Sequence, residues 1–514
     1  MINSGTREDD VCVKKHIERL RGMHDRLPEN YQQQRWVMDR LSAFLRQAGY
    51  APVDPPILEH SELFQSSFGQ ELWQNLYTFR LHHRDLCMRP EFTASICRLY
   101  LDHFQQQSLP LRFQYEGPVF RYETPGRGRY RQHTQLGVEM FGGHIISADA
   151  EILQLACEAL NKLHITSYRL ELGHIGVVSG FINRLQLDDH AARLLLSLME
   201  QISRSDEGEQ IAQTRLEALY PENRAGESEK SNYYMNTTSV GDAHLLASLL
   251  SSVSVTFGSD DARHEVVERF LWKMERGEQR RRILNALEFL RALHAISGSP
   301  PEVFGALRDL LERYELDPKP LVELEQLVGV IEQSAVSSQQ IALNLALGRG
   351  VSYYTGLVFE IHALDEDGFD TQLCGGGRYD NLLRAVGGTR NINACGFAFG
   401  VERLLPLIPK SHLPLVEKTQ ALIIPVNIQN IPYALRVARV AREFGLRVEV
   451  DVTEHGVGAA LKLATKKEIP RAVIVGEDEQ QTNRVTLHDL VTGEELVVDI
   501  HSFAQHFSGE EQPV

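Results

Sequence analysis

One stretch of the chain, residues 120–142, constrains its fold and chemistry more than any other. Its arginines surround a tight proline and glycine turn, and they are Arg121, Arg127, Arg129 and Arg131. Gln135, Gly137 and Glu139 then alternate along the returning segment, which predicts a strand, a turn and a second strand. Guanidinium groups bind phosphate oxygens bidentately and stay charged at any working pH, so the hairpin suits a polyphosphate. Taken alone, the same residues also fit an exposed hairpin with a solvated basic tip.

Composition limits the kind of protein that this chain can be. It has 514 residues, of which 43% are hydrophobic and 24% are charged, as in soluble globular enzymes of about two to four domains. It contains no run of about 18 apolar residues, and residues 1–10 lack the apolar core of a signal peptide. We therefore expect a cytoplasmic protein with no membrane partner.

Cysteine, histidine and net charge narrow the possible sites. The six cysteines are scattered, with no Cys-x-x-Cys pair, which argues for reduced, mostly buried thiols and against a zinc ribbon. The 20 histidines show no metal-ligand spacing, and His82 and His83 fall in a predicted hairpin turn, so we predict no metal site. The net charge of −16 counts against a nucleic-acid partner but does not exclude one, because the arginines are concentrated in one hairpin.

Hydrophobic spacing predicts the elements of the first two thirds of the chain. A helix is predicted over residues 29–48 and a proline-rich extended segment over 52–59. Strand and helix signals then alternate to residue 176, which predicts a mixed, mainly antiparallel sheet flanked by helices. Residues 177–340 are predicted to be mostly helical, with helices at 194–202, 266–274, 280–296, 301–314 and 321–334.

The last third shows a second change of pattern. Strand signals resume at residue 341, and a closing helix is predicted over 397–405. A proline-containing linker at 409–418 precedes a second α/β unit at 419–514. That unit has three buried strands separated by helices and two final segments that predict an edge hairpin. Such a pattern alone is compatible with many functions.

Further motifs flank residues 120–142. Arg89–Ala94 precedes them, and Arg349–Gly356, Gly375–Asp380 and Gly396–Leu404 follow. Residues 120–142 closely resemble motif 2 of the class II aminoacyl-tRNA synthetases in the form found in the histidyl-tRNA synthetase family, and Gly396–Leu404 resembles motif 3. Five motifs in the family's order over about 320 residues are very unlikely to agree by chance.

The resemblance implies an α+β fold. A class II catalytic domain with an antiparallel sheet would occupy residues 18–176 and 341–408, after a polar lead at 1–17. The helical segment at 177–340 would be an insertion, and the last unit resembles the class II anticodon-binding domain. The helix and extended segment at 28–59 resemble motif 1, a dimer interface in this class, so a homodimer is implied. An edge strand closed by prolines fits those residues equally well.

The resemblance also implies a reaction. Histidine would be activated with ATP to histidyl-adenylate and transferred to tRNA(His), with Mg²⁺ bridging the phosphates. Because the attacking carboxylate and the α-phosphate are both anionic, such a site must supply fixed positive charge and positioning. The residues that match the catalytic positions are Arg121 and Arg349.

The substrate positions are matched one by one. Those matching ATP-binding positions are Arg121, Glu123, Arg129, His133 and Arg403, with Glu123 at the adenine amino group and His133 able to stack on the base. Those matching histidine-binding positions are Glu91, Thr93, Gln135, Glu139, Arg349, Tyr353 and Tyr354. A carboxylate and a phenol can bond both imidazole nitrogens, which rejects side chains that lack such groups. Residues 375–377, all glycine, would let the backbone approach the substrate.

Structural roles remain open for several of these residues. Tyr353 and Tyr354 could pack on the sheet, Arg403 could form a salt bridge at a helix end, and Glu91 could cap the helix that follows it. Their joint occurrence in the family's order favours the functional interpretation.

Several positions depart from the family's usual pattern. Ser352 stands where an aspartate is usual, Phe92 replaces a glycine, and His133-Thr134 replaces the more common Phe-His. Thr124 and Gly126 replace side chains often used on the acceptor end of the tRNA. These departures leave recognition of the tRNA open.

Two alternatives follow from the departures. Residues 170–177, with Phe92 and Thr134, are more similar to the regulatory subunit of ATP phosphoribosyltransferase, a relative that senses histidine and charges no tRNA. Such a chain would need a phosphoribosyltransferase partner, and it usually ends near motif 3. The C-terminal unit and the retained phosphate-binding arginines favour the enzyme. A third possibility is an enzyme that activates an amino acid for an acceptor other than tRNA.

Overall fold

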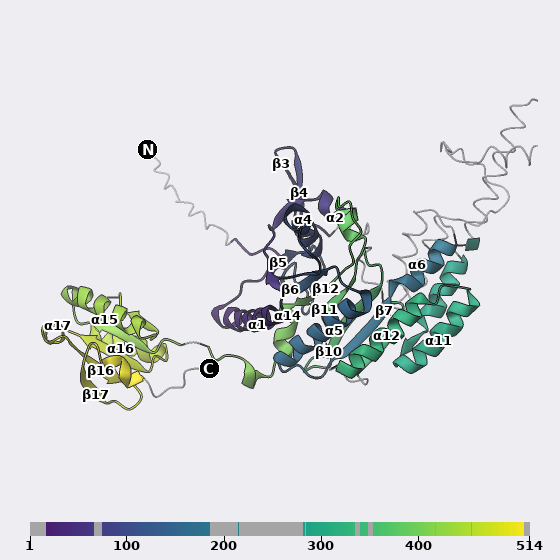
Figure 1. The fold of residues 1–514 in the computed structure, drawn as a ribbon. Coiled ribbons are helices and arrows are strands. Elements are labelled where there is room, and N and C mark those ends of the chain that lie inside the picture. Colours follow the sequence, from purple (N-terminus) through teal and green to yellow (C-terminus); the bar gives the residue numbers. More distant parts are fainter. Residues whose placement is uncertain are drawn as a thin grey trace, which may run out of the picture. The chain divides into compact units, whose positions relative to one another are not determined.

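The computed structural model describes residues 17–65, 75–185, 214, 281–282, 284–334, 340–347, 353–416, 418–453 and 455–507. These residues belong to two compact units, Met1–Pro414 and Leu415–Val514, which Figure 1 shows in sequence colours. The helices predicted at 194–202 and 266–274, and the residues Arg349 and Ser352, lie outside the described residues.

The first unit is built on a nine-stranded sheet. Adjacent strands pair antiparallel except for β1 with β5 and β7 with β9, which are parallel. A mixed, mainly antiparallel sheet was predicted, and it is confirmed. In spatial order the strands are β1 (Ala51–Pro52), β5 (Leu111–Phe120), β6 (Gln132–Phe141), β12 (Ala394–Gly400), β11 (Asp370–Arg378), β10 (Leu357–Leu364), β7 (Arg169–His174), β9 (Ile341–Asn344) and β8 (Ser297–Gly298).

The hairpin predicted at residues 120–142 is present. Strands β5 and β6 pair along their whole lengths, from Phe120 opposite Gln132 to Leu111 opposite Phe141. The loop between them turns at Gly128, whose positive φ of 64° is a backbone conformation that favours glycine. The arginine-rich turn is therefore fixed to two long neighbouring strands of the sheet.

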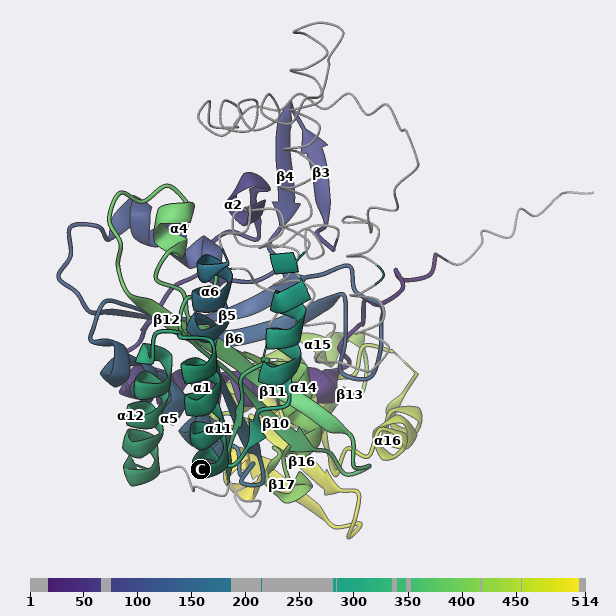
Figure 2. The same ribbon diagram turned by 90° about the vertical axis from the view of Figure 1, so that its right-hand side faces the viewer.

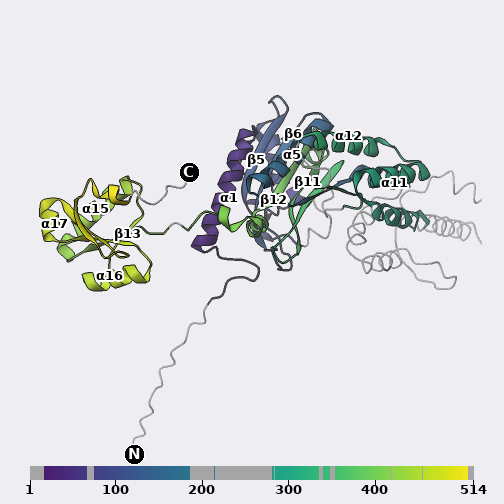
Figure 3. The ribbon, with the colours of Figure 1, turned by 90° about the horizontal axis from the view of Figure 1, so that it is seen from below.

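Long helices cover one face of this sheet. Helix α1 (Pro28–Gln47) begins with proline at its first position, where no backbone donor is needed, and Gly49 follows its end with a φ of 87°. It packs beside α5 (Ile145–Lys162), and Figure 3 shows both helices from below. Both helices share a hydrophobic core with alternate residues of β6. The buried members of α1 are Gln34, Val37, Leu41 and Leu45.

The opposite face carries α4 (Thr93–His103) and the short α13 (Leu382–Ala385), which pack together over a separate core. Phe113 and Tyr115 of β5 belong to that core, whereas Leu136, Val138 and Met140 of β6 belong to the core of α1 and α5. Since Phe113 lies directly opposite Glu139, the Glu139 side chain lies on the α4 face.

The closing helix predicted at 397–405 is wrong over its first half. Residues 394–400 form strand β12 between β6 and β11, and helix α14 (Val401–Leu404) begins only after Gly400. Phe397 and Phe399 are both buried, and their spacing of two residues is that of a strand.

The described part of the insertion is mostly helical. Helices α6 (Ile175–Arg184), α11 (Pro300–Arg313) and α12 (Lys319–Ser334) adjoin one another in Figures 1 and 2. The rings of Phe181 on α6 and Phe289 stack with centroids 3.8 Å apart, and Tyr314 packs edge-on against both.

A small sheet of β2 (Leu58–His60), β4 (Arg84–Met88) and β3 (Thr78–Leu81) stands apart from the large one. His82 and His83 form its hairpin turn, with positive φ angles and exposed side chains, as predicted.

The five cysteines within the described residues are free and buried, also as predicted. A search of the described helices for a long, apolar membrane-crossing segment finds none.

The second unit is an α/β layer with a five-stranded sheet. Its strands run in the order β14 (Val448–Val450), β13 (Ala421–Pro425), β15 (Arg471–Val475), β16 (Arg484–Asp489) and β17 (Glu495–Asp499). The first three are parallel and the last two form the predicted edge hairpin. Helix α15 (Ile431–Glu443) covers one face and α16 (Val457–Lys466) the other, because alternate residues of β13 are apolar on both sides. A short helix, α17 (Glu477–Thr482), was not predicted.

Candidate active site

A buried carboxylate lies at the centre of the α4 face. Glu139 on β6 is 1% exposed, and three hydroxyl groups contact it. Thr93 donates to its Oε1 over 2.7 Å, Tyr115 donates to the same oxygen over 3.1 Å, and Tyr379 donates to Oε2. Burial raises the pKa of Glu139 to about 8, against the opposing effect of these hydrogen bonds. We call Glu139 with Thr93, Tyr115 and Tyr379 the carboxylate cluster.

Glu91 caps helix α4. Its Oε1 accepts a hydrogen bond of 3.0 Å from the backbone N–H of Ala94, and its Oε2 accepts one from that of Thr93. The alternative role considered for Glu91, a helix cap, is therefore what the structure shows. The cap fixes the first turn of α4, and that turn presents the Thr93 hydroxyl to Glu139.

Tyr353 joins the edge of the carboxylate cluster. Its ring centroid lies 4.9 Å from that of Tyr354 and 5.7 Å from that of Tyr379. Burial, with Glu91 and Glu139 nearby, raises its pKa well above the usual tyrosine range, so the phenol stays protonated. The structure thus brings five predicted residues together: Glu91, Thr93, Glu139, Tyr353 and Tyr354.

Glycines leave room for the side chains of this cluster and of Tyr354. A Cβ atom at Gly396 would lie 1.9 Å from Oε2 of Glu139, and one at Gly377 would lie 2.8 Å from the Tyr354 ring. Gly376 faces the other way, where a Cβ would meet the Phe359 ring. Of the glycines predicted to admit substrate, Gly376 and Gly377 therefore lie on opposite faces of the sheet.

Gln135 lies on the same face of β6 as Glu139, four residues before it. Its side-chain Oε1 is buried and has no hydrogen-bond partner among the described residues. A buried amide oxygen without a partner is costly, and a ligand with a donor would satisfy it.

The arginines form a second group beside the first. Arg121 donates from Nε to the carbonyl oxygen of Pro90 over 2.9 Å, which places it next to Glu91, and its Nη1 is 3.9 Å from Glu123. Loss of hydration, then the charges of Arg121 and Arg403, lower the pKa of His133 to about 3. Its imidazole is therefore neutral at working pH. We call Arg121, His133 and Arg403 the arginine cluster.

Arg403 joins motif 3 to the motif 2 loop. It donates from Nε to the carbonyl oxygen of Gly128 over 3.1 Å and from Nη1 to that of Gln372 over 3.0 Å. Backbone carbonyl groups thus help to orient its guanidinium. Arg129, also in this loop, is exposed.

Comparisons with known proteins show the family to which the chain belongs. A family model described as histidyl-tRNA synthetase matches residues 22–226 and 233–404, and one described as anticodon binding domain matches 420–509. The first match covers more than half of the chain.

The chain belongs to the histidyl-tRNA synthetase family. It is 27% identical over 487 residues to the histidine–tRNA ligase of Methanococcus vannielii, covering 94% of this chain and 98% of that protein. Its fold is similar to apo histidyl-tRNA synthetase of S. aureus, with a TM-score of 0.60, 21% identity, and coverage of 96% of this chain and 100% of the other. The fold is also similar to a Bacillus halodurans C structure described as an ATP phosphoribosyltransferase regulatory subunit/histidyl-tRNA synthetase. The TM-score is 0.58 and the identity 21%, with coverage of 89% of this chain and 98% of the other. These likenesses confirm the predicted fold class.

Two residues of the carboxylate cluster escaped prediction, and so did an ion pair that bonds Thr134 of β6. Tyr115 and Tyr379 donate hydrogen bonds to Glu139. Tyr379 lies in the Gly375–Asp380 motif, which could have indicated its role. Glu402 accepts hydrogen bonds of 2.9 Å from the Thr134 backbone to both of its oxygens, and its Oε1 lies 2.8 Å from Nη2 of Arg26. Arg26 and Glu402 lie far apart in the sequence, and no local pattern pairs them.

Arg127 points away from the arginine cluster. It pairs with Asp365 at 3.1 Å and with Asp367 at 2.5 Å, and its guanidinium lies over the Phe369 ring. Of the four hairpin arginines, this one is attached to the turn between β10 and β11.

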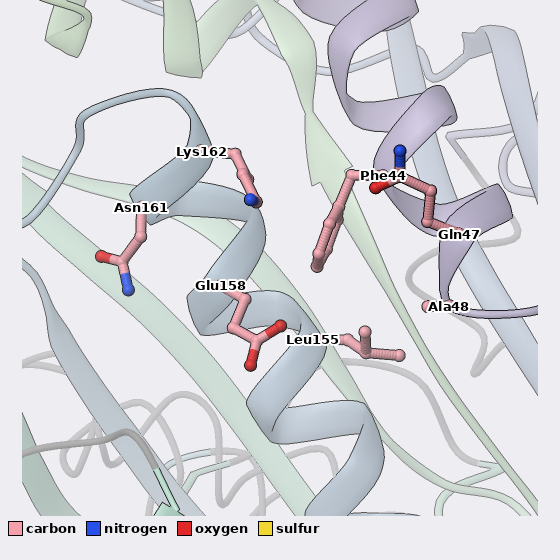
Figure 4. Close-up of a pocket in the computed structure, with 7 residues that line it drawn as sticks. All are labelled: Phe44, Gln47, Ala48, Leu155, Glu158, Asn161 and Lys162. Carbon is pink, nitrogen blue, oxygen red and sulfur yellow. The ribbon is translucent and has the colours of Figure 1, made fainter.

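A surface pocket of about 590 Å³ lies elsewhere in the first unit, between the ends of α1 and α5 (Figure 4). None of the predicted site residues lines it; its lining is Phe44, Gln47, Ala48, Leu155, Glu158, Asn161 and Lys162. Within the described residues, no group of three histidine, cysteine, aspartate or glutamate side chains is arranged to hold a metal ion.

Proposed function

We propose that this chain is a histidine–tRNA ligase, which activates histidine with ATP to histidyl-adenylate and transfers it to tRNA(His). The carboxylate cluster beside the arginine cluster carries the proposal. A buried carboxylate among phenols suits an imidazole, which presents two ring nitrogens, while guanidinium groups suit phosphates. The match to an anticodon-binding domain supports tRNA as the acceptor.

In the first step the histidine carboxylate oxygen attacks the α-phosphorus of ATP, the bond from that phosphorus to the bridging oxygen breaks, and pyrophosphate leaves. Arg121 would bind the α-phosphate and the carboxylate, so that two anions approach beside a fixed cation. Arg403 and Arg129 would bind the outer phosphates. Glu123 would contact the adenine amino group, and the neutral ring of His133 would stack on the base.

On the other side of the site, Glu139 and Tyr354 would contact the imidazole. Thr93, Gln135 and Tyr353 would contact the remaining polar groups of the amino acid. The unpartnered Oε1 of Gln135 supports a bond to the ammonium group. Glu91 would act from its capping position at the start of α4.

Mg²⁺ would bind with the nucleotide. The described residues form no three-ligand metal group, which fits Mg²⁺ because in nucleotide sites substrate phosphates and water supply most of its ligands. When bound, it would neutralise charge on the phosphates. In the second step a terminal ribose hydroxyl of the tRNA attacks the carbonyl carbon of the adenylate, and AMP leaves.

A homodimer through the motif 1 region completes the proposal. This region and the small sheet beside it expose the apolar side chains of Ile57, Leu58, Phe79 and Leu81. Light scattering on the purified chain should give twice the monomer mass of 58.2 kDa.

The regulatory-subunit alternative is less well supported. The segment that resembles that relative has a structural role here: His174 accepts a hydrogen bond of 3.1 Å from Gly176 at the start of α6 and lies 3.0 Å from Glu323 on α12. It joins the insertion helices to the sheet.

Amino-acid-dependent exchange of pyrophosphate into ATP tests the first step. We expect histidine alone among the standard amino acids to support exchange. Arg349, which lies outside the described residues, remains a prediction: Arg349→Ala should abolish exchange and leave histidine binding measurable by calorimetry. Exchange at a substantial rate in that variant would contradict the role of Arg349. Exchange supported by a different amino acid in the unmodified chain would contradict the proposed histidine–tRNA ligase activity.

A further inference from the structure

Phe92, one of the departures from the family pattern, lies between two flat groups. The Arg89 guanidinium carbon is 3.9 Å from the centroid of the Phe92 ring, and the Tyr115 ring stacks on it at 4.4 Å with an angle of 15°. A planar ring has two faces, so Arg89 and Tyr115 each cover one. Phe92 is 0% exposed and Arg89 is 1% exposed.

The stack ends on the carboxylate cluster. The Tyr115 hydroxyl donates to Oε1 of Glu139 over 3.1 Å, so the tilt of the Tyr115 ring determines where that hydroxyl lies. Phe92 is also the residue between Glu91, which caps α4, and Thr93, which donates to the same oxygen. The first turn of α4 therefore reaches Glu139 by two routes, one through Thr93 and one through the stacked rings.

The other end of the stack is attached to the proline-rich segment. Arg89 donates from Nη1 to the carbonyl oxygen of Pro55 over 2.5 Å and from Nε to that of Pro118 over 3.0 Å, and its Nη1 lies 3.7 Å from Asp54. These bonds fix the plane of a buried cation that would otherwise be costly to enclose. The plane of Arg89 in turn fixes the plane of Phe92.

Gly117 leaves the room that the stack needs. A Cβ atom there would lie 2.6 Å from Nη2 of Arg89 and 3.2 Å from Cζ of Phe92, and its φ of 155° is one that side chains rarely adopt. Tyr115 and Gly117 lie on the same strand, two residues apart, so one strand supplies both the ring and the gap beside it.

We propose that Phe92, held by Arg89 and stacked on Tyr115, is a positioning residue for histidine recognition. It fixes the Tyr115 hydroxyl on Glu139 and so orients the carboxylate that receives the imidazole. The proposal rests on the proposed function, because it assigns the carboxylate cluster to the histidine side chain. It also connects the motif 1 region, through Pro55 and Arg89, to amino-acid selection.

The test is a double-mutant cycle on the full chain, read out as the histidine Kd by calorimetry and the ATP KM by pyrophosphate exchange. Phe92→Leu removes the ring and keeps an apolar side chain. We expect it to weaken histidine binding by about 3- to 10-fold, the value of one aromatic pair, with the ATP KM changed by less than about 2-fold. In a Tyr115→Phe background, which has no hydroxyl to position, Phe92→Leu should weaken histidine binding by less than about 2-fold further.

Phe104→Leu is the matched control, since it removes a ring from the same core. Phe104 packs against Phe113, with centroids 4.8 Å apart, and should leave the histidine Kd unchanged. If Phe92→Leu does not fold, Phe92→Met, whose flexible unbranched side chain can fill an irregular gap, takes its place in the cycle.

Three results would overturn the inference: an unchanged histidine Kd in Phe92→Leu, an ATP KM that rises equally, or a full penalty in the Tyr115→Phe background. If the wild-type chain and Phe92→Leu bind histidine equally well, only the positioning role is refuted. Wild-type chain that binds no histidine would refute both the inference and the proposed function.

Discussion

The two halves of the site are built in opposite ways. The carboxylate cluster is buried and internally bonded, since Glu139 is 1% exposed and accepts hydrogen bonds from three hydroxyls. The arginine cluster is more open, and its guanidinium groups donate to the backbone carbonyls of Pro90, Gly128 and Gln372. The carboxylate cluster is thus fully hydrogen-bonded without a ligand, whereas the arginine cluster presents oriented guanidinium groups.

Under the proposed function, the difference follows from the chemistry of each ligand. An imidazole is distinguished from other side chains by where its nitrogens lie, so the groups that recognise it must be fixed in advance. A triphosphate carries enough charge to be attracted by cations that are merely oriented. Selectivity should therefore depend on the carboxylate cluster and rate on the arginine cluster.

Arg121→Ala should have the largest effect. It removes the cation expected at the α-phosphate, where charge develops, and we expect the rate of adenylate formation to fall by about 100- to 1000-fold. Histidine binding by calorimetry should weaken far less than the rate falls, because Arg121 would contact the histidine carboxylate but not the imidazole. Equal losses in rate and in histidine affinity would break the division between the halves.

Glu139→Gln should have the converse effect. Replacing the carboxyl by an amide puts two N–H donors where an acceptor oxygen stood, and we expect this to weaken histidine binding by about 10- to 100-fold. The ATP KM of Glu139→Gln should stay unchanged. Glu123→Gln is the matched control, and it should raise the ATP KM and spare histidine. A histidine Kd unaffected by Glu139→Gln would remove Glu139 from recognition.

The raised pKa of Glu139 predicts a pH dependence of stability. Its pKa rises from 4.5 in the unfolded chain to about 8 in the fold, so the native state holds a proton that the unfolded state has lost. Between pH 4.5 and 8 the free energy of unfolding should therefore fall as pH rises, by up to about 1.4 kcal/mol per pH unit from this group. Urea unfolding of wild type and Glu139→Gln at several pH values isolates the contribution. A difference between the two proteins that stays flat or grows with pH would contradict the buried, protonated carboxyl.

Arg127→Ala should have the smallest effect. The Arg127 side chain is 56% exposed and pairs with Asp365 and Asp367 rather than with the arginine cluster. Exposed pairs of this kind contribute little, so the exchange rate and ATP KM should change by less than about 2-fold. A loss approaching that of Arg121→Ala would place Arg127 in the phosphate site after all.

Local patterns predicted much of this fold. The hairpin at 120–142 follows from alternation and a proline and glycine turn, and the second unit follows from continuous apolar strands between helices. The closing helix failed because Phe397 and Phe399 pack as alternating strand residues against neighbours that the sequence does not place nearby. Helix α6 was not anticipated as an element, since Gly176 and Gly180 weaken its helical signal.

The site was predicted to the extent that its residues lie within short motifs. Glu139, Thr93 and Arg121 belong to such motifs and do meet on one face of the sheet. Tyr379 lies 240 residues from its partner Glu139, and the stack on Phe92 joins residues 89–92 to Tyr115 of another chain segment. Contacts of this kind depend on the register of the assembled sheet, which no local pattern contains.

Transfer of radiolabelled histidine to a tRNA(His) transcript, with ATP and magnesium, tests the central claim most directly. Charging of tRNA(His), and no charging of a tRNA for another amino acid, is the result we predict. Histidine-dependent pyrophosphate exchange without any charging would contradict the claim and point to a different acceptor, and histidine binding with neither exchange nor charging would point to a sensor.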